Sequence, residues 1–232
     1  MTDPFALLPL AVAAGGGRID GHAVSAMVAA GVTLLQRCAP LVRAMATGRS
    51  ALLLPPGPEF FTALAASDGR GALLLDPSGA GEELMQQLTD ARVRAVFTRA
   101  RLTTALRRGG GEPLAIVLLD EAPARATVLT ADRSIAVDLG SHRGLMLEGD
   151  QQAAGLDEEC LVTVSVAADG VRRIESHTHR SLLADSRGAA GRPDPSFPRE
   201  LAAAASWSDL GSFTTACAAL LRGADLRTRA PV

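Results

Sequence analysis

The sequence predicts an α/β protein with a doubly wound, mostly parallel β-sheet and helices on both of its faces. Short apolar runs rich in Leu, Val and Ala recur along the chain. Each run is followed by a turn rich in Pro, Gly or Asp, and each turn leads into a segment whose apolar residues have helical spacing. Strands that alternate with helices in this way form parallel sheets that the helices cover. We expect residues 1–232 to form one such domain.

The first half of the chain contains most of this alternation. Residues 1–20 include the apolar run FALLPLAVAAGGG, and we expect a flexible N-terminus there. Residues 22–46 have helical spacing, with Pro40 placed to kink or split the helix. Strands are expected at Ala51–Leu54, Ala72–Leu75, Val93–Thr98 and in PLAIVLLDEAP (113–123), and helices at Glu59–Ala66, Glu82–Thr89 and from about residue 100 through Arg108.

The second half is less regular. Residues 120–158 contain two strand-like segments, TVLTA and SIAVDL, which we expect to form a peripheral hairpin or loop. A strand over 161–166, a second strand and a helix over His179–Ala190 follow. Residues 191–200 are a Pro-rich loop. The last expected helix covers Gly211–Leu221, and Gly223 and a short tail come after it.

The composition excludes several classes of function. The net charge is −2, which gives no general attraction to nucleic acid or to anionic membranes. The N-terminal apolar run is too short to span a bilayer and has no basic residue before it, so we expect a cytoplasmic protein. All basic residues other than histidine are Arg; without Lys, there is no side-chain amine for a Schiff base or a lysine phosphate clamp.

The cysteines and histidines do not predict a metal site or a bound cofactor. Cys38, Cys160 and Cys217 lie far apart in apolar contexts, which is typical of buried reduced thiols. His177 and His179 would share one face of a strand, but no carboxylate or Cys partner accompanies them. We therefore expect no metal and no cofactor.

Three motifs occur in an order and at a spacing that resemble a known family. Residues 54–60, LPPGPEF, follow a predicted strand, EEL stands at 82–84, and residues 178–183, THRSLL, open a predicted helix. Together they resemble the N-terminal part of the adenylate-forming superfamily of acyl-CoA synthetases, luciferases and peptide-synthetase adenylation domains. The resemblance covers nearly the whole chain and implies the α/β fold of that N-terminal subdomain.

The resemblance also places the phosphate loop of the family on Ser165–Ile174. The family loop, TSGTTGxPKG, uses glycines, hydroxyls and a lysine to hold phosphate oxygens. Here Ser165 and Gly170 keep their residue types, Arg173 stands at the lysine, and Asp169 adds a repelling carboxylate. The candidate nucleotide-binding residues are Ser165, Gly170, Arg172, Arg173 and His179. Two interpretations are open: a turn between two strands, which we expect, or a phosphate site in which arginine replaces lysine.

These departures lead us to expect a protein without catalytic activity. The metal- and adenine-contacting segments of the family and the C-terminal lid with its catalytic lysine have no counterpart in these residues. We expect a structural or regulatory module that binds a protein, and we expect no ATP or AMP binding. One alternative is half of a split AMP-dependent ligase that a second polypeptide completes. Another is a sensor of a nucleotide or acyl ligand.

The C-terminal region predicts association with a protein partner or with a second copy. Residues 201–222 contain a helix that is apolar nearly all round, so both of its sides need cover. We expect an interface there because exposed apolar side chains favour association. The expected interface residues are Leu201, Trp207, Leu210, Phe213, Leu220 and Leu221.

Overall fold

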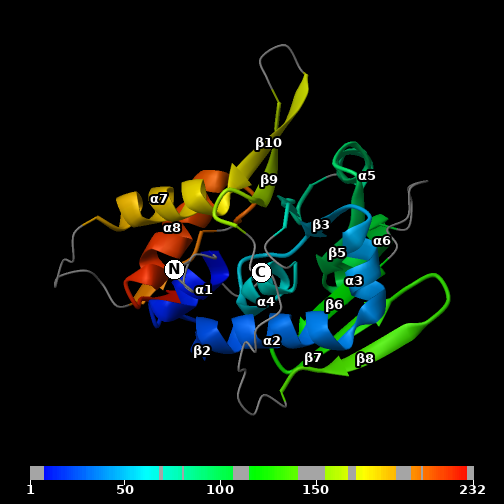
Figure 1. Cartoon of the computed structure of the whole chain (residues 1–232), viewed down its shortest axis with the longest axis horizontal. Helices are drawn as coiled ribbons and strands as arrows, with labels where there is room; N and C mark the ends of the chain where they lie inside the picture. The colour runs from blue at the N-terminus through cyan, green and yellow to red at the C-terminus, as the bar shows by residue number, and fades with distance from the viewer. Residues whose placement is uncertain are drawn as a thin grey trace.

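An eight-stranded β-sheet forms the centre of the computed structural model, which describes residues 8–67, 70–79, 81–106, 115–140, 155–166, 171–191, 200–204 and 206–228. The strand order is β10-β9-β4-β3-β5-β6-β7-β8. The five strands from β9 to β6 are parallel, and antiparallel strands flank them at both edges (Figure 1). The bounds are β3 (Arg49–Leu52), β4 (Ala72–Leu74), β5 (Val93–Thr98), β6 (Ala115–Glu121), β7 (Arg125–Leu129), β8 (Ser134–Asp138), β9 (Glu159–Val166) and β10 (Arg172–Thr178).

Helices cover both faces of this sheet, as the sequence predicts. Helices α2, α3 and α4 pack on one side, and α5 and α6 pack on the other. Along β3 and its continuation, Leu52 and Leu54 face the first side, whereas Ala51 and Leu53 face the second. The bounds are α1 (Leu8–Ala14), α2 (Val24–Arg37), α3 (Ala39–Ala46), α4 (Pro58–Ala66), α5 (Gly81–Asp90), η1 (Ala100–Leu102), α6 (Thr103–Leu106), α7 (His179–Ala190) and α8 (Leu210–Leu221).

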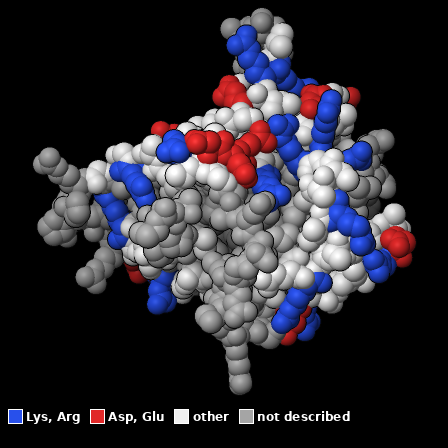
Figure 2. Space-filling model, viewed as in Figure 1, with Lys and Arg blue, Asp and Glu red and all other residues white. Residues whose placement is uncertain are grey.

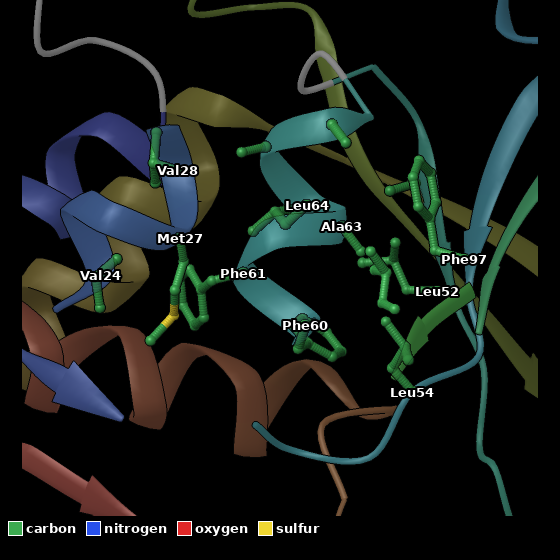
Figure 3. Close-up of a cluster of buried hydrophobic side chains, with 14 of the residues drawn as sticks. Val24, Met27, Val28, Leu52, Leu54, Phe60, Phe61, Ala63, Leu64 and Phe97 are labelled. Atoms are coloured by element: carbon green, nitrogen blue, oxygen red, sulfur yellow. The ribbon is translucent and has the colours of Figure 1, made fainter. Parts of the chain in front are cut away.

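Helix α4 is buried along its whole length. Figure 3 shows Phe60 and Phe61 of this helix pointing into the core between α2, α8 and the sheet. The ring of Phe60 meets the ring of Trp207 edge-on, with 5.0 Å between the ring centroids, and also lies against Phe213. Helix α2 approaches α4 closely at Gly31, where a Cβ would meet the backbone of Thr62. Among the described residues, every aromatic side chain except Phe97 of β5 therefore belongs to this one cluster.

Most predicted elements are present, with shifts of a few residues at their ends. Strand β5 and helix α7 have the predicted bounds. The predicted break near Pro40 is confirmed: α2 and α3 meet at Cys38 at an angle of 89°. Within the expected hairpin or loop at 120–158, β7 and β8 pair at the edge of the main sheet, and residues 141–154 lie outside the described part. The predicted helix through Arg108 is followed only to Leu106, because residues 107–114 lie outside the described part.

A second sheet of four strands corrects two expectations. Its order is β11-β12-β1-β2, and it joins segments from the two ends of the described chain. The expected flexible N-terminus is wrong for residues 8–20, because α1 is buried against α2 and α8 and is followed by β1. The described part of the short tail after Gly223 contains a strand, Asp225–Arg227. The bounds are β1 (Arg18–Ile19), β2 (His22–Ala23), β11 (Glu200–Ala202) and β12 (Asp225–Arg227).

The expected Pro-rich loop at 191–200 is only partly described. Gly191 ends α7, Glu200 begins β11, and residues 192–199 lie outside the described part. Across the described helices, none alone has both the length and the apolar composition to cross a bilayer. The pair α2 and α3 meets those criteria only jointly, across its sharp bend.

Candidate functional site

A cleft of about 260 Å³ opens at the carboxyl ends of β4 and β9. Ligands of open α/β sheets bind beyond the carboxyl ends of parallel strands, so this edge is the expected place for a site. A neighbouring hollow of about 360 Å³ shares Glu83 with the cleft. The cleft is lined by Leu74, Asp76, Gly79, Glu83, Leu84, Gln87, Val164 and Ser208, and the hollow by Glu82, Glu83, Gln86 and Arg172.

The acidic side of the cleft comes from the turn between β4 and α5. Asp76 accepts hydrogen bonds at Oδ1 from the backbone N–H and the hydroxyl of Ser78, at 2.9 and 2.8 Å. This turn leads into α5, which carries Glu82 and Glu83 in its first turn. Carboxylates are favourable there because the N-terminal end of a helix has a partial positive charge. The local sequence thus places three carboxylates at one end of the sheet.

The predicted phosphate loop lies on the hairpin of β9 and β10. Ser165 is opposite Arg173 in the antiparallel register, which confirms the two predicted strands; residues 167–170 between them lie outside the described part. The Ser165 hydroxyl donates to Oε1 of Glu175 at 2.7 Å. A guanidinium nitrogen of Arg172 lies 3.6 Å from Oε1 of Glu83. Gly170 lies outside the described residues.

Two of the candidate groups, the hydroxyl of Ser165 and the guanidinium of Arg172, are therefore engaged by carboxylates of the same chain. Arg173 is exposed on the hairpin. On the face seen in Figure 2, charges of both signs are interspersed, and basic side chains gather on the projecting arm. A phosphate placed beside Glu82 and Glu83 would be repelled, by about 1 kcal/mol per unit charge at 4 Å even in bulk water. This hollow suits a cationic or neutral polar group better than a phosphate.

Comparison with known proteins gives a result at the level of structure alone. No protein-family model matches the sequence, and no curated protein matches it. A luciferase-like enzyme from the mealworm Zophobas morio aligns with 100% of this chain at a TM-score of 0.70 and 12% identity. The inhibitor-bound N-terminal domain of FACL13 from Mycobacterium tuberculosis aligns with 96% at 0.68 and 18% identity. The NpsA N-terminal subdomain from Klebsiella oxytoca, in complex with 3-hydroxybenzoyl-AMSN, aligns with 100% at 0.67 and 15% identity.

The chain has the fold of the N-terminal domain of adenylate-forming enzymes. This confirms the fold class and the resemblance predicted from the sequence. The chain spans 56% of the mealworm enzyme and 57% of both the FACL13 and the NpsA chains. It therefore extends over little more than half the length of these adenylate-forming structures.

His179, a candidate nucleotide-binding residue, lies in the interior of this adenylate-forming fold. It is fully buried at the start of α7, and its Nδ1 accepts a hydrogen bond from the backbone N–H of Leu8 at 3.2 Å. Thr178 caps the same helix by accepting from the N–H of Ser181. His179 thus joins α7 to α1, a contact that the sequence did not predict. Nothing in the pattern around Leu8 could have indicated it.

A salt bridge at the other end of the sheet was also missed. Arg49 of β3 donates two hydrogen bonds to Glu159 of β9, at 2.8 and 2.9 Å, and the hydroxyl of Ser176 donates to the same carboxylate. Partial burial opposes ionisation of Glu159, but the hydrogen bonds from Arg49 and Ser176 outweigh it and hold its pKa below the ordinary value. This ion pair spans β4, which lies between the two strands.

A buried ion pair lies where the strand order of the sheet reverses. The connection after β3 leads to β4 on one side, and the connection after β5 leads to β6 on the other. Arg99, which directly follows β5, donates to Oε1 of Glu59 at 2.7 Å. Glu59 belongs to α4, the helix that follows β3, and its side chain is only 10% exposed. Oε2 of Glu59 and Nε of Arg99 have no hydrogen-bond partner among the described residues. Glu59 belongs to the LPPGPEF motif, which indicated a turn and a helix start but not this pair.

The three cysteines are buried, as the sequence predicts, whereas His179 belongs to α7 and does not share a strand with His177. Cys38, Cys160 and Cys217 are buried and free of disulfides. Burial raises the pKa of Cys160 and of Cys217, which keeps them in the unreactive thiol form. Nε2 of His177 lies 2.9 Å from the hydroxyl of Thr163. The described ranges contain no cluster of His, Cys, Asp and Glu arranged to hold a metal ion.

The expected interface around α8 needs correction. Trp207, Phe213 and Leu220 are fully buried within this one chain. Leu201, Leu210 and Leu221 are partly buried and pack against the same core. Helix α8 is apolar nearly all round because α1 and α7 also cover it, together with the aromatic side chains of α4. The premise that this helix exposes an apolar side is wrong, whereas association of the chain stays a prediction.

Proposed function

We propose that this chain is a non-catalytic domain of adenylate-forming fold that acts as a structural or regulatory protein-interaction module. The observation that carries the proposal is the hairpin of β9 and β10. Its retained hydroxyl, Ser165, donates to Glu175, and its Arg172 lies beside Glu83. A loop whose Ser165 and Arg172 must first be released from carboxylates is left, among its described residues, with Arg173 as its free cation, and such a loop is a poor nucleotide site.

The absence of lysine supports the same proposal. Adenylation develops charge on the transferring phosphoryl group, and this charge requires a cation and a metal held in place beside it. No lysine is present in the 232 residues, and the cleft at the ends of β4 and β9 is bordered by carboxylates. The buried, reduced cysteines also fit a cytoplasmic location, which belongs to this proposal.

A second candidate function rests on the lengths of the neighbours. The chain covers 57% of the NpsA N-terminal subdomain and of the FACL13 N-terminal domain, which are ligand-bound and inhibitor-bound, respectively. A partner polypeptide that supplies the remaining part would make this chain half of a split ligase. A ligand sensor on the same fold is the related alternative, and either would need the hairpin to bind a nucleotide or acyl group.

Two measurements on the purified chain test the proposal. Titration calorimetry with Mg-ATP should detect no binding tighter than about 1 mM, which corresponds to about −4 kcal/mol. Pyrophosphate exchange with ATP and a panel of carboxylic acids should stay at background. Micromolar ATP binding that is lost in Arg173→Ala would establish a phosphate site and sink the proposal. Exchange that appears only after a second polypeptide from the native host is added would instead establish the split ligase.

A further inference from the structure

Strand β10 is an open edge of the eight-stranded sheet. No described strand lies beyond it, and residues 172–176 are all exposed. Figure 1 shows the hairpin of β9 and β10 projecting from the body of the molecule. A strand at the edge of a sheet presents a row of backbone N–H and C=O groups that can pair with a strand of another chain. The exposed part of β10 contains no proline, and its register is irregular only near the base, between His177 and Thr178.

The same strand carries exposed apolar surface. Ile174 is 39% exposed, and Val171, just before the strand, is 54% exposed. Among the described residues, only Val42 is another large hydrophobic residue with comparable exposure. Two of these three side chains therefore lie on one projecting edge. Apolar groups on an open edge mark it as a surface for pairing.

We infer that β10 pairs with β10 of a second copy of this chain, antiparallel and centred on Ile174. The exposed strand reads Arg172-Arg173-Ile174-Glu175-Ser176. Across a two-fold axis at Ile174, each Ile174 faces the other, each Arg173 faces a Glu175, and each Arg172 faces a Ser176. Opposite charges and apolar side chains placed directly across an antiparallel pair stabilise it. The contact is isologous, since one surface serves both copies.

The neighbouring symmetric registers are unfavourable. Residues that face each other across an antiparallel pair lie on the same face of the sheet, so a two-fold axis must pass through a residue. An axis at Arg173 places the two Arg173 side chains opposite each other, and an axis at Glu175 does the same for the carboxylates. Like charges directly opposite destabilise a pair. The register centred on Ile174 is therefore selected by charge.

Contacts within one chain are compatible with this pairing. Ser165 donates to Oε1 of Glu175 and positions the carboxylate that Arg173 of the second copy faces. Arg172, which lies beside Glu83, faces the neutral Ser176. The inference rests on the proposed function, because it names a second copy as the protein that the module binds.

Reciprocal charge substitutions test this register. Sedimentation velocity over a wide dilution series should show a reversible dimer for the wild type. Arg173→Glu and Glu175→Arg should each be monomeric at concentrations where the wild type is dimeric, because like charges then face each other. An equimolar mixture of the two variants should dimerise again, since every Glu then faces an Arg. The double variant R173E/E175R should also dimerise, by itself.

Arg101→Glu is the matched control, because it makes the same charge change at an exposed residue of η1; it should stay dimeric. A wild type that has the mass of one chain at every concentration overturns the inference. So do single variants that stay dimeric, or a mixture that stays monomeric. ATP-dependent exchange measured on the same samples separates the two ideas. Exchange above background overturns the proposed function whatever the mass, whereas an inactive monomer overturns only the pairing.

Discussion

The backbone N–H of Leu8 donates a hydrogen bond to Nδ1 of His179, although 171 residues separate them in the chain. Both residues are fully buried. Because Nδ1 is the acceptor, the neutral imidazole ring carries its proton on Nε2. The first residue of α1 is thus fixed to the first residue of α7, and this bond helps to hold the N-terminal helix in the core.

Removing this acceptor should destabilise the fold. In His179→Leu, the N–H of Leu8 stays buried without a partner, and we expect the free energy of unfolding to fall by about 1–3 kcal/mol. Urea unfolding followed by circular dichroism measures the change. His179→Asn is the matched control, because its side-chain oxygen offers an acceptor near the position of Nδ1. If His179→Leu and His179→Asn lowered the free energy of unfolding equally, the hydrogen bond would contribute nothing to stability.

The salt bridge between Arg49 and Glu159 should make stability depend on pH. The pKa of Glu159 is lowered in the folded chain, so its contribution is present above the unfolded pKa and is lost as pH falls through the folded value. Both side chains are about one-third exposed, so we expect Glu159→Gln to lower the free energy of unfolding by no more than about 1 kcal/mol at pH 7. The difference from wild type should vanish in acid, which unfolding curves at several pH values will check.

The exposed pair of Asp157 and Arg180 provides the control for that series. The distance between the paired nitrogen and oxygen is 2.7 Å, close to the 2.8 Å between Arg49 and Glu159. Both side chains of the exposed pair, however, are more than half exposed. Asp157→Asn should therefore leave the unfolding curve at pH 7 nearly unchanged. A larger effect for Asp157→Asn than for Glu159→Gln would contradict the importance of burial here.

Gly71 should not tolerate a side chain. Its φ of 54° lies in the left-handed region, and an added Cβ would clash with Oε1 of Glu159. Gly71→Ala should cost more than the roughly 1–2 kcal/mol of a left-handed alanine, because the salt bridge must also shift. Gly16→Ala, with a φ of 74° and open space around it, isolates the backbone cost. If the contact between the new Cβ and Glu159 matters, Glu159→Gln should lower the free energy of unfolding less in the Gly71→Ala background than in the wild type.

Phe213 should act on stability and not on association. Its ring projects from α8 and packs against Phe60 and Phe61, fully buried in one chain. Phe213→Ala should lower the free energy of unfolding by about 3–5 kcal/mol. Calorimetric melting measures the loss, and Leu210→Ala, at a partly buried position, should cost less. If Phe213→Ala kept the stability of the wild type but had half its mass in solution, α8 would be an interface, as the sequence first indicated.

Local sequence predicted the middle of the central sheet because its inner strands β3, β4 and β5 are buried on both faces. Val93–Thr98 is buried at every position except Arg94, and a series of such segments separated by helices leaves few arrangements. The second sheet escaped prediction because its strands have only two or three residues, and because β1 pairs with β12, which follows about 200 residues later. Such short strands carry no periodicity, and only tertiary structure brings them together.

The candidate site, too, could be predicted from the sequence only in part. The residues of the hairpin were found from the sequence, but their partners depend on register and on a neighbouring helix. Glu175 reaches Ser165 only because of the way β10 pairs with β9, and Glu83 comes from α5. For α8, apolar residues nearly all round indicated burial correctly. They carried no information on whether the same chain or another would cover the helix.

The parallel pairing of β1 with β12 has a consequence for the chain while it is being made. Arg18 emerges from the ribosome long before its partner, Asp225, has been added. At about 5–20 residues per second, the interval is roughly 10–40 s. During that time β1 has no parallel partner, and α1 lacks the two late helices, α7 and α8, that complete its cover. During this interval the apolar N-terminal segment is covered only in part, by α2 and α4, and a chaperone that recognises apolar segments would have its longest time to bind there.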